Sequence, residues 1–96
     1  MKIRWTEEAA ANLENLCLHI AEDNPSAALK TVNSIYECIE ELVLFPNRGR
    51  KGREKGTREL VLAPSPYIAT YRVKDDSVEI LHIYHGAQDF ESSAPK

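Results

Sequence analysis

The sequence is poor in cysteine, and its two thiols lack the spacing that metal or redox sites use. Cys17 and Cys38 are far apart and form no Cys-x-x-Cys motif. Both fall in stretches with helical hydrophobic periodicity, so reduced and packed thiols are expected. We therefore predict no metal and no other cofactor.

The sequence also lacks a long apolar run. No stretch approaches the roughly 20 apolar residues that a transmembrane helix needs. The chain begins Met-Lys-Ile-Arg-Trp, which is unlike the charged and then apolar start of a secretory signal. These absences predict a cytoplasmic protein that makes no contact with a membrane.

Positive charge is not in excess. The net charge is −3, and the pI is near 5.6, which argues against a general nucleic-acid binder because such domains are usually strongly basic. Hydrophobic residues make up 43% and charged residues 28% of the 96 positions, as in an ordinary globular domain. Residues 1–96 are therefore expected to form one domain, with a frayed tail at about 91–96.

One segment in the middle of the chain holds half of the positive charge. Residues 48–58 contain six of the twelve Lys and Arg residues but only one of the fifteen Asp and Glu residues, a net charge of +5. Three glycines lie among them and predict a pliable loop. A cationic loop on an acidic body indicates a focused site for an anionic partner, and the alternative is a solvated surface loop. The cations are Arg48, Arg50, Lys51, Arg53, Lys55 and Arg58.

Two stretches in the first half of the chain show helical periodicity. The first follows Thr6, which suits an N-cap position, and continues to about Asp23. The second follows Asn24, where Pro25 suits the first helical position, and ends by Pro46. Because the link between them is so short, we expect an antiparallel helical hairpin.

The second half of the chain changes to an extended pattern. Residues 59–63, 67–73 and 78–85 predict three strands separated by turn residues. Residues 2–5 predict another short strand that joins the same sheet. The fold class is therefore α+β in the order β-α-α-β-β-β, with an antiparallel sheet packed against the N-terminal helical hairpin.

Several motifs occur in a specific order along the chain. Trp5 precedes an Ala/Leu-rich helix, and five further motifs follow it: DNPSAA at 23–28, FPNRGR at 45–50, GTRELV at 56–61, PYIATYRV at 66–73 and VEILHIYHGAQ at 78–88. Together they resemble the RelE/ParE superfamily of toxins from bacterial type II toxin–antitoxin modules. The resemblance extends from Ile3 to about Phe90, and the fold it implies agrees with the predicted elements.

The resemblance implies a growth-inhibiting toxin, associated with plasmid stabilisation, that a cognate antitoxin protein binds and neutralises in a hetero-oligomer. It implies no cofactor. It leaves two targets open. ParE-like members poison DNA gyrase and have no recognised catalytic residues. RelE-like members are endoribonucleases that cut messenger RNA in the decoding site of the ribosome.

Metal-free RNA cleavage needs a base, an acid and cations that stabilise the phosphorane. RelE-like toxins supply these from Lys and Arg residues on adjacent strands and from a residue near the C-terminus. Arg58 matches one of these strand lysines, whereas Leu60, Ile68 and Gln88 occupy other positions of the set. The usual RelE residues are therefore mostly absent.

One alternative catalytic set consists of His85, Arg58 and Arg72. His85 stands where some nucleases of the family place a histidine, and imidazole transfers protons near neutrality. The two arginines would bind phosphate across the sheet, with Tyr84 or Tyr71 as proton donor. Strand alternation does not decide whether Arg72 meets His85. The alternative for His85 is a histidine at a strand end that bonds to the backbone.

The end of the last strand favours the ParE-like interpretation. A hydrophobic strand leads to His85 and then to Asp89, which is similar to the ParE ending. Low basicity also favours a protein target over ribosomal RNA, where phosphate contacts dominate affinity. Residues 48–58 would then contact gyrase, its DNA or an acidic antitoxin segment. We predict a ParE-like gyrase inhibitor; the alternatives are a RelE-like ribonuclease and a degenerate toxin that only binds antitoxin.

Other polar and aromatic residues are interpreted as structural. Trp5 is expected to anchor the core. His19 and His82 lie beside apolar stripes and are expected to be packing histidines. Glu7 and Glu8 suit the first turn of a helix, where acidic side chains are favourable.

Overall fold

The computed structural model describes residues 1–86. The sequence-based expectations that concern residues 87–96, namely those for Gln88, Asp89 and the tail, lie outside this range. The elements are β1 (Lys2–Trp5), α1 (Glu7–Asp23), α2 (Pro25–Glu40), the 3-10 turn η1 (Glu41–Val43), β2 (Arg50–Lys51), β3 (Arg58–Val61), β4 (Tyr67–Lys74) and β5 (Ser77–His85).

Both helices begin at the predicted caps. Thr6 Oγ1 accepts a hydrogen bond from Ala9 N at 3.1 Å, and Asn24 Oδ1 accepts one from Ala27 N at 3.1 Å. Each cap pairs an amide that the helix itself leaves without a partner. α1 ends at Asp23, as predicted.

The end of α2 differs from the prediction. The regular helix stops at Glu40 rather than near Pro46, and η1 continues the chain. Leu42 within η1 is fully buried. The tighter turn thus still places an apolar residue in the core, although it changes the direction in which the chain leaves the helix.

The sheet has five strands in the order β1-β5-β4-β3-β2. β2–β3, β3–β4 and β4–β5 are antiparallel, but β1 is parallel to β5. The predicted α+β fold with its antiparallel sheet is confirmed, whereas the parallel direction of β1 and the short strand β2 were not predicted. Strand direction at β1 depends on where the helical hairpin returns the chain, which residue alternation does not encode.

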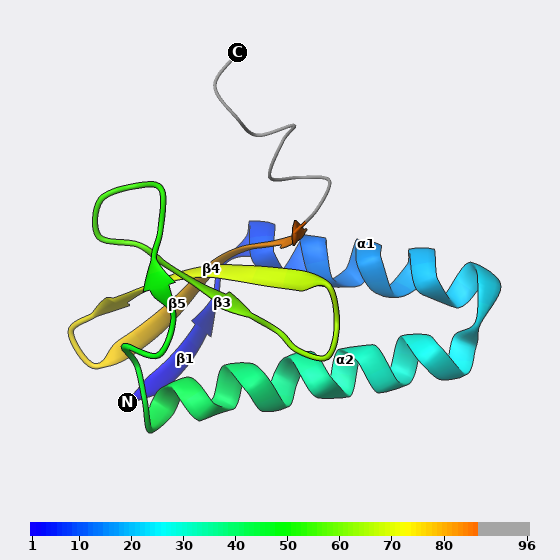
Figure 1. Cartoon of the computed structure of the whole chain (residues 1–96), viewed down its shortest axis with the longest axis horizontal. Coiled ribbons are helices and arrows are strands. Elements are labelled where there is room, and N and C mark those ends of the chain that lie inside the picture. Colours follow the sequence, from blue (N-terminus) through cyan, green and yellow to red (C-terminus); the bar gives the residue numbers. More distant parts are fainter. Residues whose placement is uncertain (87–96) are drawn as a thin grey trace, which may run out of the picture.

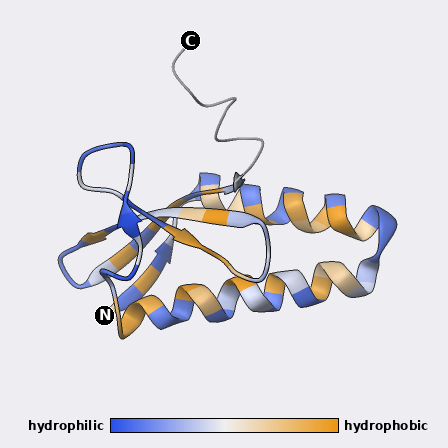
Figure 2. Cartoon of the chain, in the orientation of Figure 1, coloured by the Kyte–Doolittle hydropathy of each residue, from blue (hydrophilic) through white to orange (hydrophobic). Residues whose placement is uncertain are grey.

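α1 and α2 pack against one face of the sheet (Figure 1), and the core lies between the two layers. Figure 2 shows hydrophobic residues along both helices and on the strands that they meet. Each buried apolar side chain contributes roughly 1.5–3 kcal/mol. The largest fully buried side chains are Tyr71, Ile35, Ile39, Leu42, Leu62, Ile80 and Val78.

A β-bulge interrupts the pairing of β4 with β5. Tyr71 is opposite Ile80 and Thr70 is opposite His82, so Leu81 is an extra residue in β5. A bulge of this kind changes the face to which the following side chains point.

Side chains of α1 and its cap hold the bulge in place. Thr6 Oγ1 donates to Ile80 O at 2.9 Å and to Leu81 O at 3.2 Å. Asn12 Oδ1 accepts a hydrogen bond from Ile83 N at 3.0 Å. β1 ends before this point and cannot pair with the backbone of β5 here. The side chains of Thr6 and Asn12 pair these backbone groups instead.

None of the helices within residues 1–86 is long and apolar enough to cross a lipid bilayer.

Candidate functional site

The basic segment forms a β-hairpin, whereas the sequence predicted a loop without strands. β2 pairs with β3 through Arg50 opposite Glu59 and Lys51 opposite Arg58. Gly52 N donates to the carbonyl oxygen of Thr57 at 2.8 Å and closes the hairpin. The hairpin projects from the sheet edge as the green loop in Figure 1.

A buried tyrosine fixes the base of this hairpin. The Tyr71 hydroxyl donates to Pro46 O at 2.8 Å and accepts a hydrogen bond from Gly49 N at 2.9 Å. A Cβ atom at Gly49 would lie 2.7 Å from Glu59 O and 2.8 Å from the Tyr71 ring. Glycine is therefore needed here because the backbone passes so close to its neighbours.

Three of the six cations in the hairpin region stabilise the fold. Arg58 Nη1 donates to Gly49 O at 2.7 Å and to Asn47 O at 3.2 Å. Arg50 pairs with the buried Glu59 at 3.2 Å, and Arg48 pairs with the exposed Glu41. These arginines therefore have internal partners.

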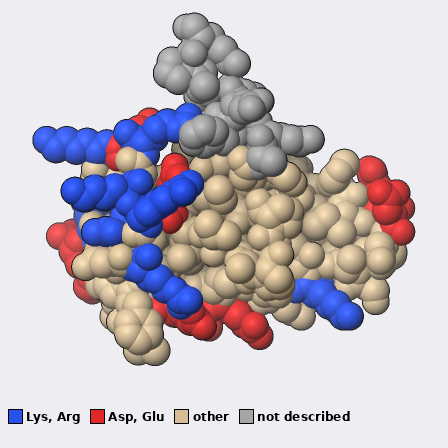
Figure 3. Space-filling view, viewed as in Figure 1, with Lys and Arg blue, Asp and Glu red and all other residues tan. Residues whose placement is uncertain are grey.

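Lys51, Arg53 and Lys55 are exposed, as are Arg48 and Arg50. In Figure 3, Lys and Arg side chains gather at the end of the molecule where the hairpin lies, and Asp and Glu side chains mark the far end of the helices. The hairpin therefore presents positive charge at the surface, and that charge favours acidic or phosphate-bearing partners.

The bulge places His85 on the side of the sheet that faces the helices. Ile80 and Ile83, which flank the bulge, both belong to the core. His85 is opposite Tyr67, whose side chain packs against the core. The two rings meet edge to face with centroids 5.5 Å apart. His85 thus lies between the layers, at the end of β5.

Arg72 lies on the opposite face of the sheet. The preceding residue, Tyr71, is fully buried in the core, so Arg72 points away from the helices. Its Nε donates to Glu79 Oε1 at 2.6 Å. This hydrogen bond is the main reason why the pKa of the Glu79 carboxyl is lowered.

The structure does not bring together the three residues of the alternative catalytic set. Arg58 is opposite Tyr71, whereas His85 is opposite Tyr67. Four residues of β4 separate these positions, which is about 13 Å at roughly 3.3 Å per residue. Arg72 lies on the other face, so these side chains do not converge on one phosphate.

The outer face of the sheet carries a pocket of about 460 Å³ that the sequence did not reveal. His82 is 48% exposed there, with Nδ1 3.0 Å from Glu8 Oε2, so the expectation of a packing histidine is wrong. The bulge, which the sequence does not signal, turns this residue outward. Glu8, Glu54 and Glu59 line the pocket together with Arg53. Carboxylates outnumber the arginine, which disfavours a phosphate backbone.

The Tyr84 hydroxyl also borders this pocket. It is buried and lies close to the Glu59 carboxylate. Burial, and then the charge of Glu59, raise the pKa of Tyr84. This residue therefore stays protonated at neutral pH and is a poor general base.

Within residues 1–86, no three His, Cys, Asp or Glu side chains are placed so that they could hold a metal ion. Both cysteines are free thiols. Cys38 Sγ donates to Ala63 O at 3.3 Å, and burial, followed by the charge of Glu41, raises its pKa. A thiol in this state is a poor nucleophile.

Comparison with known proteins identifies relatives over nearly the whole chain. The sequence profile described as "ParE toxin of type II toxin-antitoxin system, parDE" matches residues 3–90. Protein Y4kP of Sinorhizobium fredii is 44% identical over 93% of this chain and 92% of its own length. Toxin RelE2 of Caulobacter vibrioides is 33% identical over 91% of this chain and 97% of its own length.

A solved structure supports the same relationship. The chromosomal ParDE toxin–antitoxin system from P. aeruginosa contains a chain with a TM-score of 0.79 and 35% identity to this one, over 88% of this chain and 95% of that chain. Sequence and fold therefore agree on one family.

Proposed function

Because this chain belongs to the ParE toxin family of type II toxin–antitoxin systems, we propose that it inhibits growth by acting on DNA gyrase. Family membership also implies a cognate antitoxin as partner. The proposed target follows the ParE branch of the superfamily, whose members poison gyrase without recognised catalytic residues.

The observation that carries this proposal is the separation of His85, Arg58 and Arg72. Cleavage of RNA without a metal needs a base and phosphate-binding cations within about one hydrogen bond of the same reacting group. Here Arg72 is bonded to Glu79 on the outer face, and Arg58 is bonded to backbone oxygens of the hairpin base. A gyrase inhibitor needs no such convergence.

The basic hairpin is the proposed contact surface for partners. Lys51, Arg53 and Lys55 are exposed on it, and Arg48, Arg50 and Arg58 help to set its shape through bonds to neighbouring groups. Exposed cations of this kind steer association with acidic protein surfaces or with DNA. An acidic antitoxin segment that covers the same surface would block access to the target.

Purified toxin, freed from antitoxin and shown to be folded, tests the proposal in a gyrase supercoiling assay. We expect inhibition of supercoiling and gyrase-dependent cleavage trapped on the plasmid. Absence of both effects from protein that still arrests growth would refute the gyrase target.

The second candidate is a ribosome-dependent ribonuclease, and the 33% identity to toxin RelE2 is the observation that favours it. His85, Arg58 and Arg72 would then be the first residues to substitute, one at a time, because they lie too far apart to act together on one phosphate. Cleavage of messenger RNA in a translation reaction without gyrase would support this alternative.

A further inference from the structure

Two large apolar side chains are exposed next to each other at the base of the basic hairpin. Leu44 is 74% exposed and Phe45 is 60% exposed. Both follow η1, and Figure 1 shows the chain passing from this end of α2 directly to the hairpin. Neighbouring exposed residues of this size mark a contact surface more strongly than single ones do. We call Leu44 and Phe45 the apolar patch.

The backbone that carries Phe45 is held by hydrogen bonds on both sides. Phe45 N donates to Glu41 O at 3.0 Å, and Phe45 O accepts a hydrogen bond from Arg48 N at 3.1 Å. The carbonyl oxygen of the next residue, Pro46, accepts the hydrogen bond from the Tyr71 hydroxyl. The patch and the hairpin are thus fixed by the same buried tyrosine. A partner that binds both pays a smaller entropic cost than it would for two independent loops.

An open hollow of about 600 Å³ lies beside Phe45. Its lining consists of Phe45, Pro46, Asn47 and Arg48. A partner side chain can enter this hollow while the Phe45 ring enters a pocket of the partner. Anchors that pair in this way are typical of the centre of protein–protein interfaces.

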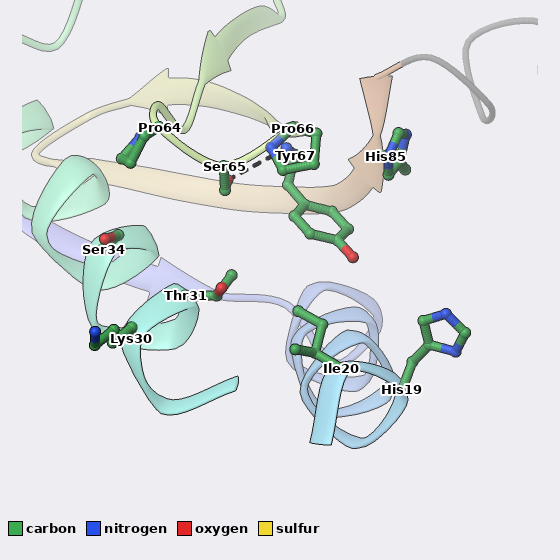
Figure 4. A pocket seen from close by; sticks show the side chains of 10 residues that line it. All are labelled: His19, Ile20, Lys30, Thr31, Ser34, Pro64, Ser65, Pro66, Tyr67 and His85. Atoms are coloured by element: carbon green, nitrogen blue, oxygen red, sulfur yellow. Dashed lines mark hydrogen bonds between the residues drawn. The ribbon is translucent and has the colours of Figure 1, made fainter. Parts of the chain in front are cut away.

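The cavity between the helices and the sheet, of about 630 Å³, lies elsewhere (Figure 4). Tyr67 and His85 line it, and these residues are paired at one end of β4. Arg58 of the hairpin is opposite Tyr71, four residues along β4. A partner that contacts the hairpin therefore meets the apolar patch at the hairpin base and not this cavity.

The charge around the apolar patch changes sign along the chain. The exposed carboxylates of Glu40 and Glu41 precede the patch, whereas the hairpin cations follow it. DNA carries negative charge along its whole length, so these carboxylates would repel a duplex that covered the patch. A protein surface can offer acidic groups toward the hairpin and an apolar pocket toward Phe45.

We propose that the apolar patch is the anchor through which the toxin binds the protein surface of its target and not the DNA, an inference that rests on the gyrase target proposed above. The surface that fits is an apolar pocket with acidic groups on the side of the hairpin. The exposed cations speed the encounter, and Phe45 slows dissociation because its ring is buried in the complex.

Binding of folded, antitoxin-free toxin to gyrase without DNA tests this proposal by biolayer interferometry. We expect the wild type to bind without DNA and Phe45→Ala to bind about tenfold more weakly, as truncation of an aromatic anchor usually does. Phe45→Leu should lie between them because it keeps part of the apolar surface. The toxin concentration that inhibits supercoiling should follow the same order.

Leu18→Ala is the matched control because Leu18 is also 60% exposed. It lies in the second half of α1, which runs toward the α1–α2 link and away from η1 (Figure 1). This variant should bind gyrase like the wild type, and equal urea midpoints would verify that both variants fold. An equal loss of binding in Leu18→Ala and Phe45→Ala would overturn the proposal.

The remaining outcomes assign the patch to other occupants or reject it. If Phe45→Ala inhibited supercoiling as well as the wild type does, the patch would be rejected and the gyrase target would stand. If Phe45→Ala weakened binding to a DNA duplex as much as binding to gyrase, the assignment to protein would be overturned. Self-association of the wild type that Phe45→Ala abolishes would assign the patch to a second copy of the toxin. Wild-type toxin that neither binds nor inhibits gyrase would overturn both proposals.

Discussion

The basic hairpin and the end of β5 both carry residues that the sequence marked as functional, but they are built differently. In the hairpin, a buried tyrosine and three bonded arginines hold the backbone, and the exposed cations project from it. At the end of β5, a bulge turns His85 toward the helices and away from Arg72. Some charged residues of a sequence motif thus hold the backbone in place, whereas others project their charge toward partners.

The largest predicted effect is on the hairpin base, through Tyr71→Phe. This change removes the hydroxyl that pairs Gly49 N and Pro46 O, and an unpaired buried polar group costs about 1–3 kcal/mol. We expect a loss of about 2 kcal/mol in the free energy of unfolding, measured with urea.

Tyr36→Phe is the matched control for this prediction. Tyr36 is 44% exposed, so removal of its hydroxyl should change stability by less than about 0.5 kcal/mol. Equal effects of the two substitutions would show that the Tyr71 hydroxyl does not hold the hairpin.

The next effect concerns the exposed charges of the same hairpin. The double charge reversal Lys51→Glu/Lys55→Glu should raise the toxin concentration needed to inhibit gyrase by about tenfold. Exposed charges at the edge of an interface speed association with an oppositely charged partner, and the substitutions reverse this attraction. Its stability should stay within about 0.5 kcal/mol of the wild type. Lys2→Glu, which changes a cation on β1 at the other edge of the sheet, should leave inhibition unchanged. If both variants lost gyrase inhibition equally, the net charge of the toxin, and not the position of the charges on the hairpin, would explain the loss.

The smallest effect concerns the ion pair that keeps Arg72 on the outer face. The hydrogen bond from Arg72 lowers the pKa of Glu79 in the folded state. Its contribution to stability is therefore complete above the ordinary pKa of glutamate and is lost as the pH falls through the lowered value. Urea unfolding across the acidic range should show a shallower loss of stability for Glu79→Gln.

Glu14→Gln on the exposed face of α1 serves as the comparison for this pH series. In this variant, the free energy of unfolding should fall with decreasing pH in the same way as in the wild type. If Glu79→Gln also left that limb unchanged, the pair with Arg72 would contribute nothing to stability.

Local signals in the sequence predicted much of the fold. The caps Thr6 and Asn24 fixed both helix starts because capping depends on residues within one turn. The direction of β1 and the bulge at Leu81 were not predictable because both depend on contacts between distant elements. The bulge in particular is held by Thr6 and Asn12 of the helical region.

The candidate site was predictable in composition but not in arrangement. The charge of residues 48–58 was evident from the sequence, whereas the internal partners of Arg48, Arg50 and Arg58 depend on the folded hairpin and the pairing of β2 with β3. The separation of His85 from Arg72 depends on the bulge, which shifts one face of β5 by a single residue.

The most direct test of the central claim compares DNA topology and messenger RNA in the same cells, shortly after the toxin is induced. A toxin that acts on gyrase should leave relaxed plasmid and gyrase-linked DNA breaks while transcripts stay intact. Transcripts cut within codons, together with normal plasmid supercoiling, would contradict it.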